Sequence, residues 1–325
     1  MTKLSAASAM EARSAESLPT EAGWWYEPKW DGFRCLAFRQ GSDVVLQAKS
    51  GKPLTRYFPE VVALLAAIPD QSFAIDGELL IPARESFSFE ALQMRLHPAQ
   101  SRILRLADET PAVLAAFDML QTPDGLDLRG EPLNLRHAAL AAFTKRHAGP
   151  RLTLTPGTDD PLAAQAWLDE GKLEGVVAKR LDGVYAEGQR AMIKVKRQRT
   201  ADCVVGGFRY SKDSPLVGSL LLGLYDEQGL LNHVGFTSGL AAVDKASLTT
   251  ALEALAGGSG FTGDAPGGPS RWSDERSSQW TALAPQMVVE VSFDHVSAGR
   301  FRHGTRLIRF RPDKAPAQCT LEQIA

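Results

Sequence analysis

The hydrophobic pattern of the chain changes near residue 200, and this change most limits the folds open to it. Before that point, stretches rich in β-branched and aromatic residues alternate with stretches whose apolar residues recur at helical spacing. The strand-like stretches are residues 24–38, 44–49, 73–81, 113–120, 175–179 and 191–196, and the helix-like ones are 58–68, 87–96, 133–147 and 161–170. The first part therefore predicts a mixed α/β core.

After residue 200 the pattern is mostly that of short strands, at residues 203–210, 219–226, 229–237, 287–292 and 306–311. A helical pattern over residues 242–255 interrupts them, and a loop over 257–270 follows. A small β-barrel of the OB kind, with a helix between its strands, fits this order. We expect a flexible N-terminal tail over residues 1–22, an α/β domain over 23–199 and an OB-fold domain over 200–325.

The length and the cysteines set further limits. The 325 residues are enough for two hydrophobic cores. Cys35, Cys203 and Cys319 are odd in number and far apart, which argues against a disulfide framework and against a zinc site. No run of residues has the length and apolar character of a signal peptide or a membrane span, so a cytoplasmic location is expected.

The net charge of −2 does not point to a nucleic-acid partner, but the cations gather in two places. A run of cations can be either a binding surface for a nucleic acid or a solvated charged face, and neither of the two runs alone decides between these interpretations. The runs are Lys194, Lys196, Arg197 and Arg199 in one place, and Arg300, Arg302, Arg306, Arg309, Arg311 and Lys314 in the other.

Lys29 is the candidate nucleophile, within the sequence Glu-Pro-Lys-Trp-Asp-Gly-Phe-Arg of residues 27–34. A lysine attacks the α-phosphorus of a nucleotide only as the neutral amine, so it needs burial or neighbouring cations. Lys194 and Lys196 are two apart on a predicted strand, so both point to one face and supply positive charge to a pocket. A divalent metal ion on the phosphates needs carboxylates. The candidates are Asp31, Glu78 and Glu174.

A Lys-x-Asp-Gly sequence alone is as readily a surface turn. In this chain, however, the order of the motifs resembles that of the covalent nucleotidyltransferase superfamily, and within it the ATP-dependent DNA ligases, from residue 24 to the C-terminus. Lys29, Asp31 and Gly32 match the nucleophile motif, and Asp76, Gly77 and Glu78 match the third motif. The resemblance implies nucleotide-binding roles for Glu27, Lys29, Arg34, Lys49, Glu78, Phe117, Glu174, Lys194 and Lys196.

The resemblance also implies what individual residues do. Glu27 would accept a hydrogen bond from the adenine amino group, and Phe117 would stack on the base, although alone it reads as a core phenylalanine. Arg34 would contact the ribose and later the nick. Lys194 and Lys196 would contact the phosphates. ATP is the implied cofactor, with Mg²⁺ or Mn²⁺ on Asp31, Glu78 and Glu174.

Near the C-terminus, residues 311–314 (Arg-Pro-Asp-Lys) resemble the Arg-x-Asp-Lys motif of the family's OB domain. The resemblance implies that Arg311 and Lys314 orient pyrophosphate in the first step and then swing away so that DNA can bind. The residues expected in catalysis are Lys29, Asp31, Lys194, Lys196, Arg311 and Lys314. Those expected to contact DNA are Arg34, Lys49, Arg197, Arg199, Arg302, Arg306 and Arg309.

The chain departs from the family pattern in two respects. Ala48 and Lys49 stand where the family usually has Ser-Arg, and a lysine lacks the two-pronged guanidinium. Only 28 residues precede Lys29, so the separate N-terminal DNA-binding domain of larger ligases is not expected. The chain is thus similar to the minimal bacterial ligases of the ligase C group and to the ligase domain of bacterial ligase D.

We therefore expect an enzyme that seals nicks in duplex DNA with ATP, through a lysyl-AMP and a DNA-adenylate, in bacterial DNA repair. An NAD-dependent ligase would carry a further N-terminal domain and a zinc module, and Glu27 favours adenine over the guanine of a capping guanylyltransferase. The sequence is also compatible with an RNA ligase and with a non-catalytic nucleic-acid-binding protein. The expected partners are nicked duplex DNA and other bacterial repair proteins, and no membrane partner is expected. The protein is expected to be a monomer that is associated with the nucleoid.

Overall fold

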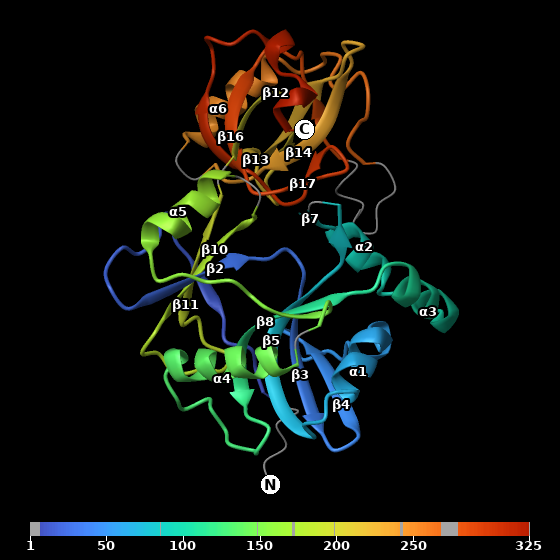
Figure 1. The fold of residues 1–325 in the computed structure, drawn as a ribbon. Coiled ribbons are helices and arrows are strands. Elements are labelled where there is room, and N and C mark those ends of the chain that lie inside the picture. Colours follow the sequence, from blue (N-terminus) through green and yellow to red (C-terminus); the bar gives the residue numbers. More distant parts are fainter. Residues whose placement is uncertain are drawn as a thin grey trace. The chain divides into compact units, whose positions relative to one another are not determined.

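The computed structural model describes residues 7–84, 86–147, 149–170, 173–197, 199–240, 243–267 and 279–324 (Figure 1). The chain divides into two compact units, residues 1–197 and residues 198–325. Each unit has its own hydrophobic core. Among the described helices, none is both long enough and apolar enough to cross a membrane.

Two sheets provide the framework of the first unit. The larger sheet has the strand order β4-β3-β5-β8-β9, and the smaller sheet has the order β1-β11-β10-β2. The strands of the larger sheet are β3 (Phe33–Gln40), β4 (Asp43–Ala48), β5 (Ser72–Leu80), β8 (Val113–Gln121) and β9 (Leu152–Leu154). Those of the smaller sheet are β1 (Ala12–Ser14), β2 (Trp24–Lys29), β10 (Gly175–Arg180) and β11 (Met192–Lys196), and β6 (Pro82–Ala83) pairs separately with β7 (Ser86–Phe87).

α1 and α4 pack on strands of the larger sheet, α5 packs on β10 and β2 of the smaller one, and α3 packs on α1 (Figure 1). α4 lies on β8, a strand that is buried over nearly its whole length, which explains why its sequence is mostly apolar rather than alternating; its buried Asp118 is ion-paired with Arg136 of α4. The start of α2 is capped by Ser88, whose hydroxyl accepts from the backbone N–H of Ala91. The helices are η2 (Thr55–Tyr57), α1 (Pro59–Ala66), α2 (Phe89–Met94), α3 (Gln100–Glu109), α4 (Leu133–Arg146) and α5 (Pro161–Glu170).

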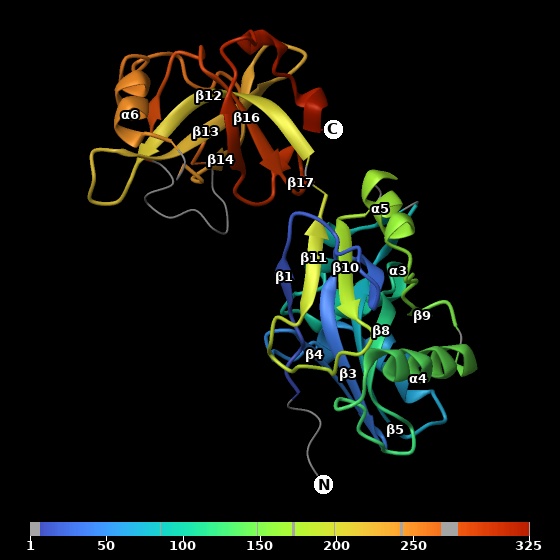
Figure 2. The ribbon, with the colours of Figure 1, turned by 90° about the vertical axis from the view of Figure 1, so that its left-hand side faces the viewer.

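The N-terminal segment differs from the flexible tail that the sequence predicts. β1 pairs in parallel with β11, and Figure 2 shows the two strands side by side. Ala7, Ala9 and Met10 are buried in a cluster under these strands, and the Met10 N–H donates to the Tyr185 hydroxyl at 3.1 Å. Small apolar side chains thus fill space beside β11, while residues 1–6 lie outside the described part of the chain.

The sequence predicts one strand over residues 24–38, and the structure has two. β2 ends at Lys29 and β3 begins at Phe33. Gly32 lies in the intervening turn, where an added Cβ would overlap the carbonyl oxygen of Leu79. The glycine of the Lys-x-Asp-Gly motif is therefore required by the close approach of two backbones. The break places Lys29 at the end of a strand of the smaller sheet, next to the start of a strand of the larger one.

The second unit is built on a sheet with the order β14-β13-β12-β16-β19, whose β-bulges in β12 and β13 curve it. Helix α6 is capped by Asp244 and is shorter than the predicted 242–255; Ala242 and residues 268–270 of the predicted loop lie outside the described residues. The strands are β12 (Arg199–Tyr210), β13 (Val217–Tyr225), β14 (Leu231–Thr237), β15 (Thr281–Ala282), β16 (Val288–Phe293), β17 (Val296–Ser297), β18 (Arg300–Phe301) and β19 (Arg306–Phe310), and the helices are α6 (Lys245–Glu253), η3 (Pro316–Gln318) and η4 (Leu321–Ile324).

Candidate active site

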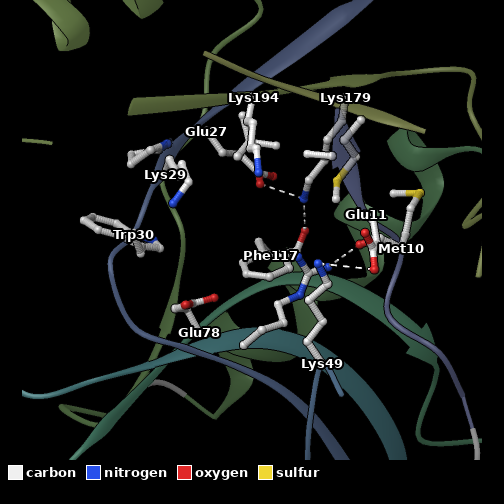
Figure 3. A pocket seen from close by; sticks show the side chains of 15 residues that line it. Met10, Glu11, Glu27, Lys29, Trp30, Lys49, Glu78, Phe117, Lys179 and Lys194 are labelled. Carbon is white, nitrogen blue, oxygen red and sulfur yellow. Dashed lines mark hydrogen bonds and ion pairs between the residues drawn. The ribbon is translucent and has the colours of Figure 1, made fainter. Parts of the chain in front are cut away.

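A cavity of about 200 Å³ lies between the two sheets of the first unit. One wall comes from β2, β10 and β11 and the other from β3, β5 and β8 (Figure 3). Of the residues predicted from the sequence, the cavity brings together Glu27, Lys29, Arg34, Lys49, Glu78, Phe117 and Lys194. These seven residues come from five strands and one loop and converge on one space, although they are spread over most of the unit's sequence.

Lys29 points into this cavity from the end of β2 (Figure 3). Its ammonium group is ion-paired with Glu174, which precedes β10 in the chain, and Glu174 also contacts the Lys196 ammonium at 2.9 Å. Burial alone raises the pKa of Glu174, but the two lysines outweigh burial and hold that pKa below its ordinary value. The carboxylate is therefore charged at neutral pH and fixes the direction of the Lys29 side chain.

Glu27 and Lys179 form a buried pair at the far end of the cavity. Their carboxylate and ammonium are 2.6 Å apart, and the side chains are 3% and 4% exposed. The other Glu27 oxygen accepts from the Trp25 indole N–H at 3.2 Å. Burial raises the pKa of Glu27, and the attraction of Lys179 counteracts only part of that rise. This carboxylate can accept a hydrogen bond from a base edge that reaches it.

Phe117 presents its ring between two cations. The Arg34 guanidinium and the Lys179 ammonium each lie 4.5 Å from the ring centroid. The Arg34 guanidinium is held by Asp76 through two hydrogen bonds of 2.6 Å, and the Tyr185 hydroxyl donates to the same carboxylate. Asp76 is fully buried, so it orients Arg34 and does not face the cavity itself. An aromatic face between cations is a suitable platform for a nucleobase.

Glu78 faces the cavity from β5, opposite Lys29 (Figure 3). Burial raises the pKa of its carboxyl to about 8, even though Arg34 and Lys29 lower it, and the nearby carboxylates Asp76 and Asp31 raise it further. Asp31 lies in the loop just after Lys29, so the predicted metal ligands Asp31 and Glu78 are close enough to influence each other. Asp31 and Glu78 supply hard oxygen donors of the kind that a divalent metal ion prefers, but among the described residues no group of three or more His, Cys, Asp or Glu side chains is arranged to hold one, so Glu174 does not join them in a ready-made site.

Replacing Glu78 with glutamine is expected to change how stability depends on pH. A carboxyl with a higher pKa in the folded than in the unfolded state binds its proton more tightly when folded, so its contribution to stability falls as pH rises between the two values. For Glu78 this window runs from its ordinary value of 4.5 to about 8. In the Glu78→Gln variant this loss of stability with rising pH is absent. The free energy of unfolding of the variant minus that of the parent protein should therefore rise from pH 5 to pH 8. Urea denaturation without nucleotide or metal measures both free energies. The exposed Glu131→Gln serves as the control, and an equally flat difference for both variants would contradict the assignment.

The N-terminal segment adds residues that the sequence reasoning missed. Met10, Glu11 and Ala12 line the cavity, and the Glu11 carboxylate is 3.2 Å from the Lys49 ammonium. A wider groove of about 890 Å³ adjoins the cavity, and Glu11 and Lys49 line both spaces together with Arg34 and Glu78. Lys49 is 53% exposed, so its charge is accessible from the groove. No motif in the sequence marks residues 10–12. Lys179 could have been predicted, because it is a charged residue near the end of an otherwise apolar strand.

Three of the predicted cations of the second unit form ion pairs within that unit. Arg311 and Lys314 both contact Asp202, and Arg309 contacts Glu290 at 2.7 Å. Arg306 and Arg309 are exposed and Arg302 and Arg199 are partly buried, with the Arg199 guanidinium 5.0 Å from the Phe293 ring. Arg197 belongs to the first unit and is partly buried there. The two cationic runs of the sequence thus fall mostly on different units.

Comparisons with known proteins cover almost all of the chain. The family model "ATP dependent DNA ligase domain" matches residues 6–196, and "ATP dependent DNA ligase C terminal region" matches residues 213–314. DNA ligase C1 of Mycolicibacterium smegmatis is 43% identical over 97% of this chain and 92% of that protein. DNA ligase C of Mycobacterium tuberculosis is 41% identical over 98% of this chain and 93% of that protein. Among solved structures, the ligase domain of M. tuberculosis LigD covers 98% of this chain and 99% of that chain, with 28% identity and a TM-score of 0.52.

Proposed function

Because the chain belongs to the ATP-dependent DNA ligase family, we propose that it seals nicks in duplex DNA by carrying AMP on Lys29. The observation that carries this proposal is the cavity itself. The Lys29 amine faces a space that is also lined by the Glu27 carboxylate, the Phe117 ring and further cations, among them Lys194 (Figure 3). Glu27 and Phe117 suit the adenine, and the cations suit the phosphates.

The proposed reaction proceeds in three steps. The Lys29 amine attacks the α-phosphorus of ATP, so that a P–N bond forms, the bond to the β-phosphate oxygen breaks, pyrophosphate leaves and the amine loses a proton. A 5′-phosphate oxygen of the nick then attacks the AMP phosphorus, so that a P–O bond forms, the P–N bond breaks, and Lys29 departs as an amine that has regained a proton. Finally the 3′-hydroxyl attacks the 5′-phosphorus and loses its proton, which forms the phosphodiester bond and releases AMP. Positioning and charge stabilisation supply most of the rate in such phosphoryl transfers.

Several side chains of this chain have a defined part in these steps. Glu174, which also contacts Lys196, holds the Lys29 amine in the cavity before the nucleotide binds. Lys194 is partly buried and surrounded by cations, which together lower its pKa, so its charge is drawn toward any phosphate that enters. Asp31, Glu78 and Glu174 would hold a divalent metal ion, which supplies neutralisation of the triphosphate. Arg34 and Lys49 line both the cavity and the groove, and are placed to meet the nick phosphate.

Labelled ATP provides the direct test. The protein, Mg²⁺ and ATP labelled at the α-phosphate should give a covalent AMP adduct, and addition of nicked duplex DNA should discharge the adduct and yield sealed strands. Intact duplex should leave the adduct in place. A preference for labelled GTP would favour a capping guanylyltransferase, discharge by nicked RNA alone would favour an RNA ligase, and the absence of any covalent label would favour a binding protein.

Arg311→Ala or Lys314→Ala should impair the reaction with ATP selectively. Loss of one charged donor that stabilises the leaving pyrophosphate is expected to slow self-adenylylation about a hundredfold. Sealing of a nick that is already adenylylated involves no pyrophosphate and should be far less affected. Rates of both reactions should be compared with those of Lys212→Ala, which removes an exposed cation of the same unit. Equal losses in the two reactions would count against this division of roles.

A further inference from the structure

Arg311 and Lys314, the two cations of the Arg-Pro-Asp-Lys motif, share a single carboxylate. The Asp202 Oδ1 atom accepts from Arg311 Nη1 at 2.8 Å, and the Oδ2 atom accepts from Lys314 Nζ at 2.8 Å. Asp202 lies on β12, far from the motif in sequence, and is only 8% exposed. One buried carboxylate therefore fixes the distance between the two cations.

Asp202 is itself held by the C-terminal turn. The Gln323 side chain accepts from the Asp202 backbone N–H at 2.9 Å and donates to the Asp202 carbonyl at 3.0 Å. On one side of β12, Asp202 lies opposite Glu290 of β16. On the other side, the pairing with β13 starts only at Val204, so the Gln323 side chain makes the hydrogen bonds to Asp202 that a strand would otherwise make. The buried Ile324 anchors this turn in the core of the unit. Both the backbone N–H and the backbone carbonyl of Asp202 are thus hydrogen-bonded to Gln323.

The two cations keep donors for an anion while they are held. Arg311 uses Nε and Nη2 to contact Asp313 at 3.0 and 2.9 Å, and Nη1 to contact Asp202. A guanidinium has five N–H groups and an ammonium three, so these contacts do not exhaust either side chain. Arg311 is 18% exposed and Lys314 is 25% exposed, so both reach solvent.

We propose that Asp202 is a positioning residue for the reaction with ATP, and this rests on the proposed function of the Arg311 motif. Asp202 holds the two long cationic side chains at a fixed separation, so that their remaining N–H groups meet the oxygens of pyrophosphate together. Their rotamer freedom is then lost before the anion arrives, which is the advantage of a preorganised site. Gln323 contributes by fixing Asp202.

Asp202→Asn tests this directly, because the amide keeps the shape but can accept from only one of the two cations. Self-adenylylation should slow about tenfold to a hundredfold, the usual effect of losing a group that orients a contacting residue. Sealing of a pre-adenylylated nick should keep the rate of the parent protein. Gln323→Ala leaves the carboxylate in place and should give a smaller loss in the same step only. Glu227→Gln and Glu322→Ala remove exposed carboxylates of the same unit and should change neither step.

A double-mutant comparison separates positioning from folding. In an Arg311→Ala, Lys314→Ala background, Asp202→Asn should cause almost no further loss, because Asp202 acts only through those two residues. A full additional loss, or equal losses in both reactions, would overturn the proposal and assign Asp202 to folding. Faster adenylylation in Asp202→Asn would also overturn it, because Asp202 would then be competing with the anion.

The same experiments distinguish this inference from the proposed function. If Arg311→Ala and Lys314→Ala leave adenylylation unchanged, the function proposed for the motif fails. If they impair it while Asp202→Asn and Gln323→Ala do not, only the positioning role fails. Should Asp202→Asn unfold at the assay temperature, Gln323→Ala alone carries the test, and its unchanged adenylylation rate would overturn the proposal.

Discussion

Lys29→Ala is expected to abolish the covalent AMP adduct, with labelling reduced by at least about a thousandfold, as for the loss of other catalytic nucleophiles. The phosphoramidate needs the Lys29 nitrogen, and Lys194 reaches the cavity from a different strand, β11. The variant should still fold, because Glu174 retains its contact with Lys196 at 2.9 Å. Labelling with ATP and a thermal melt of the same sample measure both expectations.

Two further variants make this result interpretable. Lys29→Arg keeps a cation beside Glu174 but has no amine that can attack, so it should be as inactive as the alanine variant. Lys145→Ala removes an exposed lysine of α4 and should label normally. Both Lys29 variants should still seal a pre-adenylylated nick, because that step needs no lysyl-AMP. Labelling of Lys29→Ala at the parental level would falsify the assignment.

Lys179→Met is expected to be the most destabilising of the substitutions considered, by about 3–5 kcal/mol. It leaves the Glu27 carboxylate buried without its ion-pair partner and removes the donor to the Phe117 carbonyl oxygen at 3.1 Å. The pKa of Glu27 is already raised by burial and must rise further without the ammonium. A raised carboxyl pKa makes stability fall with increasing pH, so the loss should be smaller at pH 5 than at pH 8.

The matched double variant separates charge from packing. Glu27→Gln combined with Lys179→Met removes both charges with little change of shape and should recover most of the lost stability, because no unpaired charge remains buried. Lys145→Ala is the control for the loss of an exposed lysine. Urea denaturation at pH 5, 7 and 8 provides the free energies. A loss below about 1 kcal/mol for Lys179→Met, the level of an exposed pair, would show that the pair is not buried in solution.

Much of the fold could be predicted because local pattern and tertiary environment agree. The mixed α/β unit followed by a β-rich unit is confirmed by the structure and by the two ligase family matches. Strands such as β8 are mostly apolar because both faces are buried, and the sequence shows this directly. The break between β2 and β3 could not be read in the same way, since both sides of it carry strand-forming residues and only the close contact at Gly32 explains the turn.

The candidate site was predictable to the extent that its residues belong to motifs. Lys29, Glu78 and Phe117 come together in one cavity as the order of the motifs suggests. Residues that act through others were not predictable, because nothing near Asp202 in sequence points to Arg311, and nothing near Glu11 points to Lys49. Such contacts depend on strands that meet only in the folded chain.

The smaller sheet of the first unit has a consequence for synthesis on the ribosome. β1 and β2 are made first, but they pair with β11 and β10, which are made near the end of the unit. At about 5–20 residues per second, the first strands wait on the order of ten seconds for their partners. During that time the alanines and Met10 that later pack under β11 are exposed and available to chaperones. A ligand of the cavity therefore cannot guide the folding of the nascent unit, because one wall of the cavity does not exist until β11 has left the ribosome.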